Sequence, residues 1–410
     1  MGRPSAALKF LACLVLWGCG EPQKTEQTPL QFWHTFNEEE SAELQAWLSK
    51  NEPRSVVTTI LPFAVANIRV RSAIAEGACP DLLRIDSTRI PGLVESDLID
   101  EVPGAISSAR NWLPEARDLV RYRDGIYGLP QSIDGLALVR KRGRNIGWPI
   151  LSLEELEKLS ADAGPRLGML IDGYWVLGFL RAEGGELPNE GGEPSINSPK
   201  AIRALERFAS LFQRGVAMDL LDERSPSRAI IRAFRNDEID VAFTGPWDLR
   251  NLANGNPATL EVSAFPGAHA PRGGQVLVVP RCSAHRERAW ALALALSAPA
   301  LQAEWATKLG SIPVTAEGLA DAGPLANAFY KALAGTKPIP RHARAPELFD
   351  DLSPAVQAVV GRDATAEEAL AGVDRSWRRV YGLPAKATDL PPKATDLPAK
   401  ATDLPPKATE

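Results

Sequence analysis

The chain has 410 residues, a formal net charge of −5, 45% hydrophobic residues and 24% charged residues. This is the ordinary globular mixture, and roughly 150 residues per domain allows two to three domains. The acidic balance, and the lack of a basic stripe interleaved with aromatic residues, argue against a nucleic-acid partner. No apolar stretch of the sequence reaches the roughly 18 residues of a membrane span, so we expect no membrane-spanning helix.

The first residues resemble an export signal. Arg3 and Lys9 supply positive charge, and an apolar stretch follows over residues 10–17. The run Leu-Trp-Gly-Cys at residues 16–19 resembles a bacterial lipobox. It implies a lipoprotein signal peptide over residues 1–18, a lipid on Cys19 and a polar tether over 19–29. The alternative is a plain secretory signal with an unmodified Cys19.

Cysteines and histidines are too few for a metal site. After cleavage the remaining cysteines would be Cys19, Cys79 and Cys282. If Cys19 carries a lipid, the other two permit one disulfide in an oxidising compartment. The four histidines share no helix face with each other or with a cysteine at ligand spacing, so we predict no metal and no cofactor.

The elements of the first part alternate between strands and helices. The patterns predict strands over residues 30–33, 55–60 and 81–85, and helices after Asn37 and over 64–75. Asn37 precedes three glutamates, as in a helix N-cap with an acidic first turn. Such alternation favours an α/β fold with a parallel sheet.

The middle of the chain is richer in helices. Helices are predicted from Ser152, from Ser198-Pro199, and over residues 230–234, 286–297 and 367–380. Apolar strands are predicted over residues 239–243 and 275–280.

The last residues, 384–410, repeat the unit Lys-Ala-Thr-Asp-Leu-Pro. A proline in every unit excludes a continuous helix, so a disordered, extended tail is predicted. A tandem duplication without function is the simpler alternative to a spacer.

Common catalytic motifs are absent from the sequence, including the Gly-rich phosphate loops, Gly-x-Ser-x-Gly and His-Glu-x-x-His. Aromatic residues instead stand beside turns and carboxylates, as in Tyr174-Trp175 and Gly245-Pro246-Trp247. Aromatic rings stack on the apolar faces of sugars, and Asp or Asn side chains bond to hydroxyls. The combination is typical of a carbohydrate cleft.

Five segments, taken in order, resemble the extracellular solute-binding proteins of ABC importers, and among these the maltose/trehalose-type sugar-binding lipoproteins. They are Leu-Gln-Phe-Trp-His-Thr-Phe at 30–36, the Pro-Asp strand over 75–86, the run over 124–141, the helix, strand and Gly-Pro-Trp turn over 234–247, and Gly273-Gly274 before a strand. The resemblance spans about residues 30–381. It implies an α/β, two-lobed periplasmic-binding-protein fold with discontinuous lobes and a hinge between them.

The resemblance also implies lobe boundaries and ligand contacts. One lobe would hold residues 30–132 plus 274–318, and the other 136–270 plus 322–381. The ligand-binding residues implied are Asp86, Asp134, Trp247, Tyr174, Trp175, Asn67, Thr35 and Asn37. Tyr174 and Trp175 can equally be core residues. Phe349 could occupy a C-terminal aromatic position. The stretch Leu-Pro-Phe at 61–63 departs from the more polar family pattern, which leaves the ligand size open.

In lobes of this kind, the strand from Asp81 runs antiparallel to the strand from Gln275. Cys79 precedes the first strand and Cys282 follows the second. The fold therefore implies a Cys79–Cys282 disulfide, because those two strand ends lie together.

The function implied is a monomeric, lipid-anchored binding protein of the cell envelope, periplasmic or otherwise extracytoplasmic. It would capture a di- or oligosaccharide in the interlobe cleft and deliver it to an ABC transporter permease, without catalysis. Two alternatives stay open. One is a structural or sensor lipoprotein without a transport role, and the other is an envelope hydrolase using Asp86 and Asp134.

Overall fold

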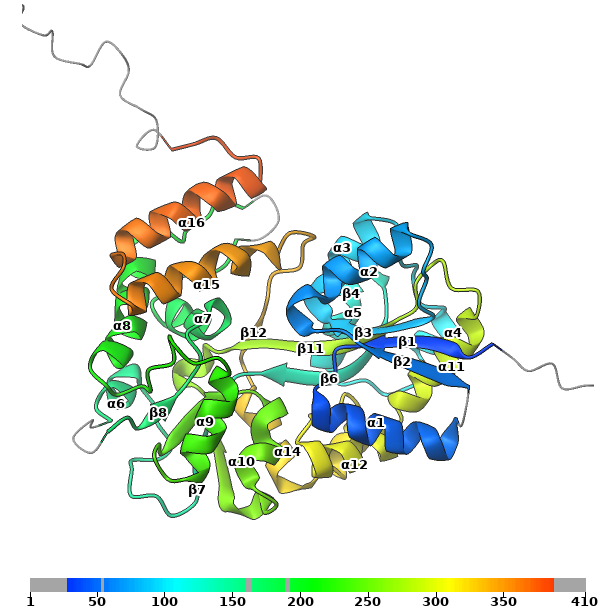
Figure 1. The fold of residues 1–410 in the computed structure, drawn as a ribbon, viewed down its shortest axis with the longest axis horizontal. Helices are drawn as coiled ribbons and strands as arrows, with labels where there is room; N and C mark the ends of the chain where they lie inside the picture. Colours follow the sequence, from blue (N-terminus) through cyan, green and yellow to red (C-terminus); the bar gives the residue numbers. More distant parts are fainter. Residues whose placement is uncertain (1–27, 53–54, 160–163, 189–191, 387–410) are drawn as a thin grey trace, which may run out of the picture.

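A computed structural model describes residues 28–52, 55–159, 164–188 and 192–386. These residues form two α/β lobes, each built around its own β-sheet, with β6 and β11 running between them (Figure 1). The predicted signal peptide with Cys19, nearly all of the tether and all but the first residues of the repeat tail lie outside the described residues. The expected two-lobed α/β fold is confirmed, and the residue boundaries of the lobes stay a prediction.

The sheet of the N-terminal lobe has the strand order β12-β11-β3-β1-β2, and β6 pairs with β11 over residues 272–277, on the edge opposite β3. Its strands are β1 (Leu30–His34), β2 (Val56–Ile60), β3 (Leu82–Asp86), β6 (Leu129–Gly135), β11 (Pro271–Val278) and β12 (Lys337–Pro338). The strands β1, β2 and β3 are parallel, as expected.

The two long strands, β6 and β11, depart from this parallel arrangement, as the resemblance implied for β11 beside β3. Strand β11 runs antiparallel to both β3 and β6. It enters this sheet directly from the other lobe rather than through a crossover helix of its own lobe, so the parallel rule for βαβ units does not apply to it.

The sheet of the C-terminal lobe has the order β10-β7-β9-β8, in which only β8 and β9 are parallel. Its strands are β7 (Ala137–Lys141), β8 (Leu167–Gly168), β9 (Val241–Thr244) and β10 (Leu260–Ser263). Strand β7 follows β6 after a single residue, so the chain crosses between the lobes there. A two-stranded ribbon, β4 (Arg121–Tyr122) with β5 (Gly125–Ile126), lies in the N-terminal part of the chain.

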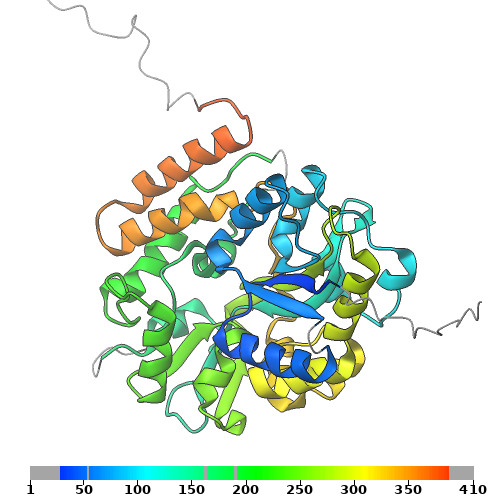
Figure 2. The same cartoon turned by 45° about the vertical axis from the view of Figure 1, so that its right-hand side comes forward.

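Helices cover both sheets (Figures 1 and 2). Those of the N-terminal part are α1 (Glu38–Asn51), α2 (Ala66–Ala75), α3 (Ile90–Glu95), α4 (Gly104–Ser107) and α5 (Pro114–Val120). The middle adds α6 (Leu153–Glu157), α7 (Gly173–Ala182), α8 (Pro199–Gln213), α9 (Pro226–Arg235) and α10 (Leu249–Ala253). The last part adds α11 (Arg286–Leu296), α12 (Pro299–Leu309), α13 (Ala316–Ala320), α14 (Gly323–Ala332), α15 (Glu347–Val360) and α16 (Ala366–Val380). Both α15 and α16 pack on α8, so the end of the described chain completes the C-terminal lobe.

Local sequence signals account for the start of the best-predicted helices. The Asn37 side chain accepts a hydrogen bond from the backbone N–H of Glu40, and the Glu40 carboxylate accepts one from the backbone N–H of Asn37. This capping box satisfies donors that a helix start leaves unpaired. The Ser198 hydroxyl caps α8 by accepting a hydrogen bond from the backbone N–H of Ala201, with Pro199 at the first helical position. The apolar stripe that follows it, including Phe208 and Leu205, is buried.

A disulfide joins Cys79 to Cys282, with their Cα atoms 6.0 Å apart. The bond follows from the strand register, because β3 and β11 are antiparallel neighbours and the two cysteines flank the same end of this pair. It ties together residues that are 203 positions apart in sequence. Closing such a long loop restricts the unfolded chain strongly.

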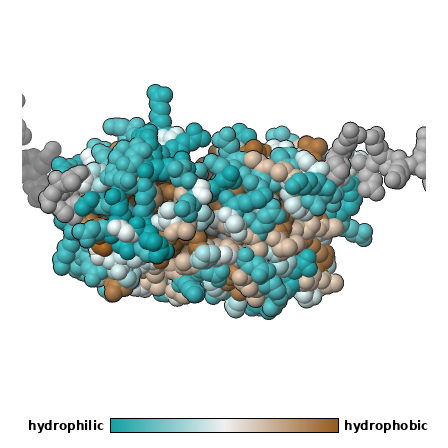
Figure 3. Space-filling view, turned by 90° about the horizontal axis from the view of Figure 1, so that it is seen from below, coloured by the Kyte–Doolittle hydropathy of each residue, from teal (hydrophilic) through white to brown (hydrophobic). Residues whose placement is uncertain are grey.

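Hydrophilic residues cover much of the lower face, and hydrophobic ones lie between them in small groups (Figure 3). Isolated apolar side chains are normal on a surface exposed to water. Within the described residues, every helix is too short or too polar to cross a membrane.

Candidate ligand-binding cleft

A cavity of about 820 Å³ lies where the two lobes meet. The first lobe lines it through the ends of β1 and β3 and the start of α1, and the second through α7, the turn after β9 and α15. The strands β6 and β11 contribute residues where they run between the lobes. A cavity of this size, between lobes, is where a small-molecule ligand is expected to bind.

The strand register places four polar side chains on one face of the first sheet. Gln275 of β11 is paired with Asp86 of β3 on one side and with Ser132 of β6 on the other. Asp134 lies two residues beyond Ser132, and it pairs with Gly273. Directly opposed residues, and residues two apart along a strand, share a face. All of these residues therefore line the cavity together.

Asp134 is buried among these polar groups, with only 8% of its surface exposed. Its Oδ2 accepts a hydrogen bond from Gln275 Nε2 at 3.3 Å. Burial, followed by the charge of Asp86, raises the pKa of Asp134 from 3.8 to about 7. A carboxyl group in this state can both donate and accept hydrogen bonds near neutral pH.

Arg84 connects several side chains of the same wall through hydrogen bonds and an ion pair. It is buried, donates to Gln131 Oε1 at 2.9 Å and to Thr35 Oγ1 at 3.2 Å, and its guanidinium lies 3.6 Å from the Glu40 carboxylate. Thr35 Oγ1 in turn lies 3.3 Å from Gln275 Oε1. These bonds hold the polar side chains of the wall in position.

Aromatic rings form the facing wall. Trp175 lies against Tyr174 and Trp247, with ring centroids 5.8 Å and 6.4 Å away, and Tyr174 also lies 6.2 Å from Phe349. Tyr174 and Trp175 begin α7, whose N-cap Asp172 accepts from the Tyr174 backbone N–H. Trp175 is itself anchored by its Nε1, which donates to the Phe243 carbonyl at 2.7 Å.

The turn after β9 presents Trp247 to the cavity. A Cβ on Gly245 would overlap the Trp247 ring, so this turn needs glycine. Thr244 Oγ1 donates to Asp248 Oδ2 at 2.6 Å across the same turn. Burial raises the pKa of Asp248 to about 6.

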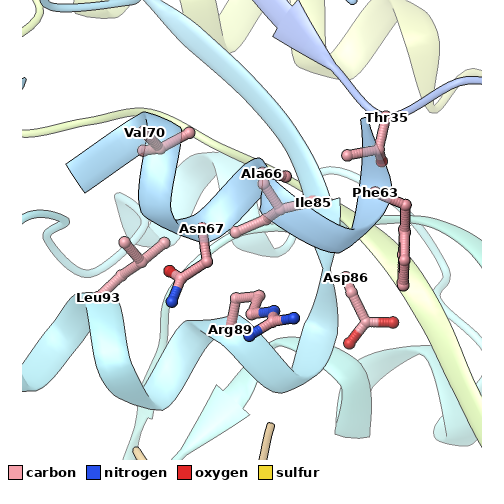
Figure 4. Close-up of a pocket in the computed structure, with 9 residues that line it drawn as sticks. All are labelled: Thr35, Phe63, Ala66, Asn67, Val70, Ile85, Asp86, Arg89 and Leu93. Atoms are coloured by element: carbon pink, nitrogen blue, oxygen red, sulfur yellow. The ribbon is translucent and has the colours of Figure 1, made fainter. Parts of the chain in front are cut away.

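Seven of the eight expected ligand-binding residues line the cleft: Thr35, Asn37, Asp86, Asp134, Tyr174, Trp175 and Trp247. Asn67 does not. It points from the first turn of α2 into a smaller neighbouring pocket (Figure 4), which shares Asp86 and Arg89 with the cleft. The amide oxygen of Asn37 is engaged in capping α1. Whether these seven residues and Asn67 contact a ligand stays a prediction.

Other lining residues escaped the sequence reasoning. Arg84 and Gln275 lie within apolar strand sequences, so the sequence alone did not distinguish them from core positions. The period-two alternation of a strand could have placed Arg84 on the face of Asp86. Gly273 is also part of the site, since a Cβ there would come within 2.9 Å of Asp134 Oδ1. Further lining residues are Phe63, Ser132, Asp172, Ile339, Asp350 and Ser353, and Phe349, which the resemblance placed at a C-terminal aromatic position, also lines the cavity.

Two comparisons identify relatives of the chain. Residues 57–332, more than half of the chain, match the family model described as bacterial extracellular solute-binding protein. The chain belongs to this family, which places it on the extracytoplasmic side of the cell. None of the curated proteins compared with the chain matches it significantly.

Solved structures share the fold. The GacH receptor of Streptomyces glaucescens, solved unliganded and with acarbose, has 23% identity and a TM-score of 0.78, covering 86% of this chain and 98% of its own. MalX from Streptococcus pneumoniae, in complex with maltopentaose, has 17% identity and a TM-score of 0.71, with 86% and 100% covered. The maltotriose-binding protein of Thermus thermophilus, bound with maltotriose, has 17% identity and a TM-score of 0.72, with 85% and 100% covered.

Proposed function

We propose that this chain is the sugar-binding component of an ABC importer. It captures a di- or oligosaccharide in the cleft and delivers it to the transporter permease. The proposal rests on one observation: two chemically different walls face each other across one cavity. Tyr174, Trp175 and Trp247 form an aromatic wall, and Asp86 and Asp134 belong to a polar one.

The two walls match the two kinds of surface on a sugar ring. The C–H faces of a pyranose stack on aromatic rings, and the hydroxyls at its edge bond to carboxyl and amide groups. Together these contacts support a dissociation constant in the micromolar range, or about −8 kcal/mol. The same bonds form and break without covalent chemistry, so binding without turnover is the expected behaviour.

Delivery requires that the permease distinguish the sugar-bound protein from the empty protein by its conformation. The two lobes meet at the ligand, and hinge closure around a ligand is a common response of two-lobed proteins. A sugar that touches both walls binds the closed form better than the open form. Only such differential affinity shifts the equilibrium toward closure. The closed lobes would be the form presented to the permease.

The family match and the acidic, export-type sequence support a location in the cell envelope. We propose that Cys19 carries a lipid that anchors a monomer to the membrane, with residues 19–29 as a tether. Mass spectrometry of detergent-extracted protein tests the anchor. A diacylglyceryl mass on Cys19 is expected, and an unmodified Cys19 or cleavage elsewhere would contradict it.

Calorimetric titration of the purified chain against maltose, trehalose and longer glucans tests the binding function. We expect saturable heat with one sugar per chain. Recovery of the sugar intact after prolonged incubation separates a binding protein from a hydrolase that uses Asp86 and Asp134. An absence of heat with every sugar, from protein shown to be folded by circular dichroism, would instead favour a structural or sensor role.

A further inference from the structure

Three segments that connect the first sheet with the second lobe meet at one place. They are the link from β6 to β7 at Leu136, the start of β11 at Pro271, and β12, which leads on to α15. Strand β12 lies beside the start of β11 between the two lobes (Figure 1). The backbone N–H of Leu136 donates to the Pro271 carbonyl at 3.3 Å, and Pro271 is paired with Lys337 of β12. Connecting positions of this kind absorb the movement of two lobes, so we call this place the junction.

One buried side chain of α7 binds the junction. Only 5% of the surface of Arg181 is exposed. Its Nη1 donates to the Lys337 carbonyl at 2.9 Å and to the Ala270 carbonyl at 3.5 Å. Its Nη2 donates to the Pro338 carbonyl at 3.0 Å, and its Nε donates to the Glu186 carboxylate at 2.8 Å. The planar guanidinium thus bonds to β12 and to the residue before β11 at the same time.

Burial makes these bonds of Arg181 important. A charged group that is removed from water is costly unless its donors are bonded. Glu186 supplies the opposite charge, and its second oxygen lies 3.5 Å from the Lys337 ammonium. Truncation of Arg181 would remove the donors that join α7 to both strands. The helix would then be free to shift relative to β11 and β12.

Helix α7 also carries part of the aromatic wall. Tyr174 and Trp175 stand in its first turn, about two turns before Arg181. The polar wall comes close to the same helix at Gly273 of β11. A Cβ on Gly273 would lie 2.9 Å from Asp134 Oδ1 and 3.7 Å from the Tyr174 hydroxyl. The spacing of the two walls is therefore set beside the place where Arg181 joins α7 to β11 and β12.

Arg181 lies outside the residues that line the cleft, so its effect on a ligand is indirect. We propose that Arg181 is a positioning residue: it fastens α7 to the junction and so sets the distance between the aromatic wall and the polar wall. This inference rests on the proposed function and deepens it, because it assigns control of sugar affinity to a residue that the sugar does not touch. Without Arg181 the rings of Tyr174 and Trp175 lose their fixed place opposite Asp134, and a site that is held more loosely binds more weakly.

Titration calorimetry with the tightest-binding sugar of the panel tests this role in Arg181→Met, which keeps an extended side chain and removes its donors. The matched control is Arg207→Met. Arg207 of α8 also holds the end of α7, where it pairs with Glu183 at 2.9 Å. Its other ion pairs are with α6, away from the junction. Urea unfolding of both variants measures how much stability each one loses.

A double-mutant cycle with Tyr174→Ala separates positioning from a general loss of stability. If Arg181 acts through the place of this ring, its removal matters less once the ring is gone, whereas a purely structural effect is additive. We expect roughly ten-fold weaker binding in Arg181→Met, about the loss of one contact with the sugar, and less than about three-fold in the Tyr174→Ala background. Arg207→Met should stay within about two-fold of the wild type.

Unchanged affinity in folded Arg181→Met overturns the inference. An equal loss in Arg207→Met, or an effect of full size that persists in the Tyr174→Ala background, does the same. Should Arg181→Met fail to fold, Arg181→Lys, which keeps the charge beside Glu186 without the planar fork, replaces it and the same outcomes decide. In all of these cases sugar binding by the wild type leaves the proposed function standing. A wild type that binds no sugar of the panel counts against both.

Discussion

The two walls of the cleft are built by different means. The polar wall stands on strands β3, β6 and β11, whose backbone register puts Asp86, Gln275 and Asp134 on one face. The aromatic wall stands on a helix start and a tight turn, where Trp175 and Trp247 are placed by side-chain packing. Selectivity and affinity therefore arise mainly from different walls. A sheet holds hydrogen-bonding groups rigidly and so selects hydroxyl geometry, whereas rings supply apolar contact that tolerates different sugars.

The largest expected effect concerns the stability of the polar wall. Asp134 has a native pKa of about 7 against 3.8, so the native state keeps a proton that the unfolded chain has released between those pH values. Its contribution to the unfolding free energy is therefore full below about pH 4 and is lost as the pH rises through about 7. The loss is on the order of 4 kcal/mol.

Urea unfolding of the wild type and of Asp134→Asn from pH 4 to pH 8 measures this loss. We expect the stability of the wild type relative to the variant to fall with pH. Burial and the charge of Arg84 lower the pKa of His34 to about 4, which works in the opposite direction but is common to both proteins. A difference that stays constant with pH would show that Asp134 is ionised normally.

On the aromatic wall, Trp247→Ala is expected to weaken sugar binding roughly 30-fold. Removal of the buried indole face costs about 2 kcal/mol of apolar contact. Trp47→Ala on α1, outside the cleft, is the matched control and should leave the affinity unchanged. Unchanged affinity in Trp247→Ala would remove this ring from the site.

The space between the two walls is expected to have the next largest effect on sugar affinity. In Gly273→Ala the new methyl group lies 2.9 Å from Asp134 Oδ1 and 3.7 Å from the Tyr174 hydroxyl. Crowding of this kind costs about 1–3 kcal/mol, so we expect roughly ten-fold weaker binding by titration calorimetry. Gly104→Ala, where a Cβ meets nothing within 4 Å, is the control. Equal affinities of the two variants would mean that the ligand lies elsewhere.

The smallest expected effect distinguishes a residue that only lines the cleft from one that contacts the sugar. Asn37→Ala should cost about 1 kcal/mol of stability through loss of the α1 cap, with sugar affinity within two-fold of the wild type. Thr365→Ala removes the equivalent cap of α16 and should behave alike. A ten-fold affinity loss in the Asn37 variant alone would make its amide a direct ligand contact.

Sequence reasoning predicted most of the first lobe because its signals are local. The N-cap at Asn37 and the apolar runs that became β1 and β3 depend on neighbouring residues only. The antiparallel course of β11 depends instead on how the chain returns from the other lobe. No periodicity within the strand records that return, so its antiparallel pairing with β3 was predicted from the family resemblance and not from a local pattern.

The cleft was predicted unevenly for the same reason. Asp86 and Trp247 end recognisable segments, and both line the cavity. Arg84 was not predicted as a site residue because it lies within an apolar strand. Its role depends on hydrogen bonds to Thr35 and Gln131, which lie 49 and 47 positions away in the sequence. Asn67 lines the smaller pocket beside the cleft, and its contact with a ligand stays a prediction.

A crystal structure of the chain with its tightest-binding sugar would show whether the ligand contacts both walls of the cleft. We expect one sugar ring stacked on Trp247 or Tyr174, with its polar groups bonded to Asp86 and Asp134 on the opposite wall. A sugar that contacts a single wall, or that lies outside the cavity, would contradict the account.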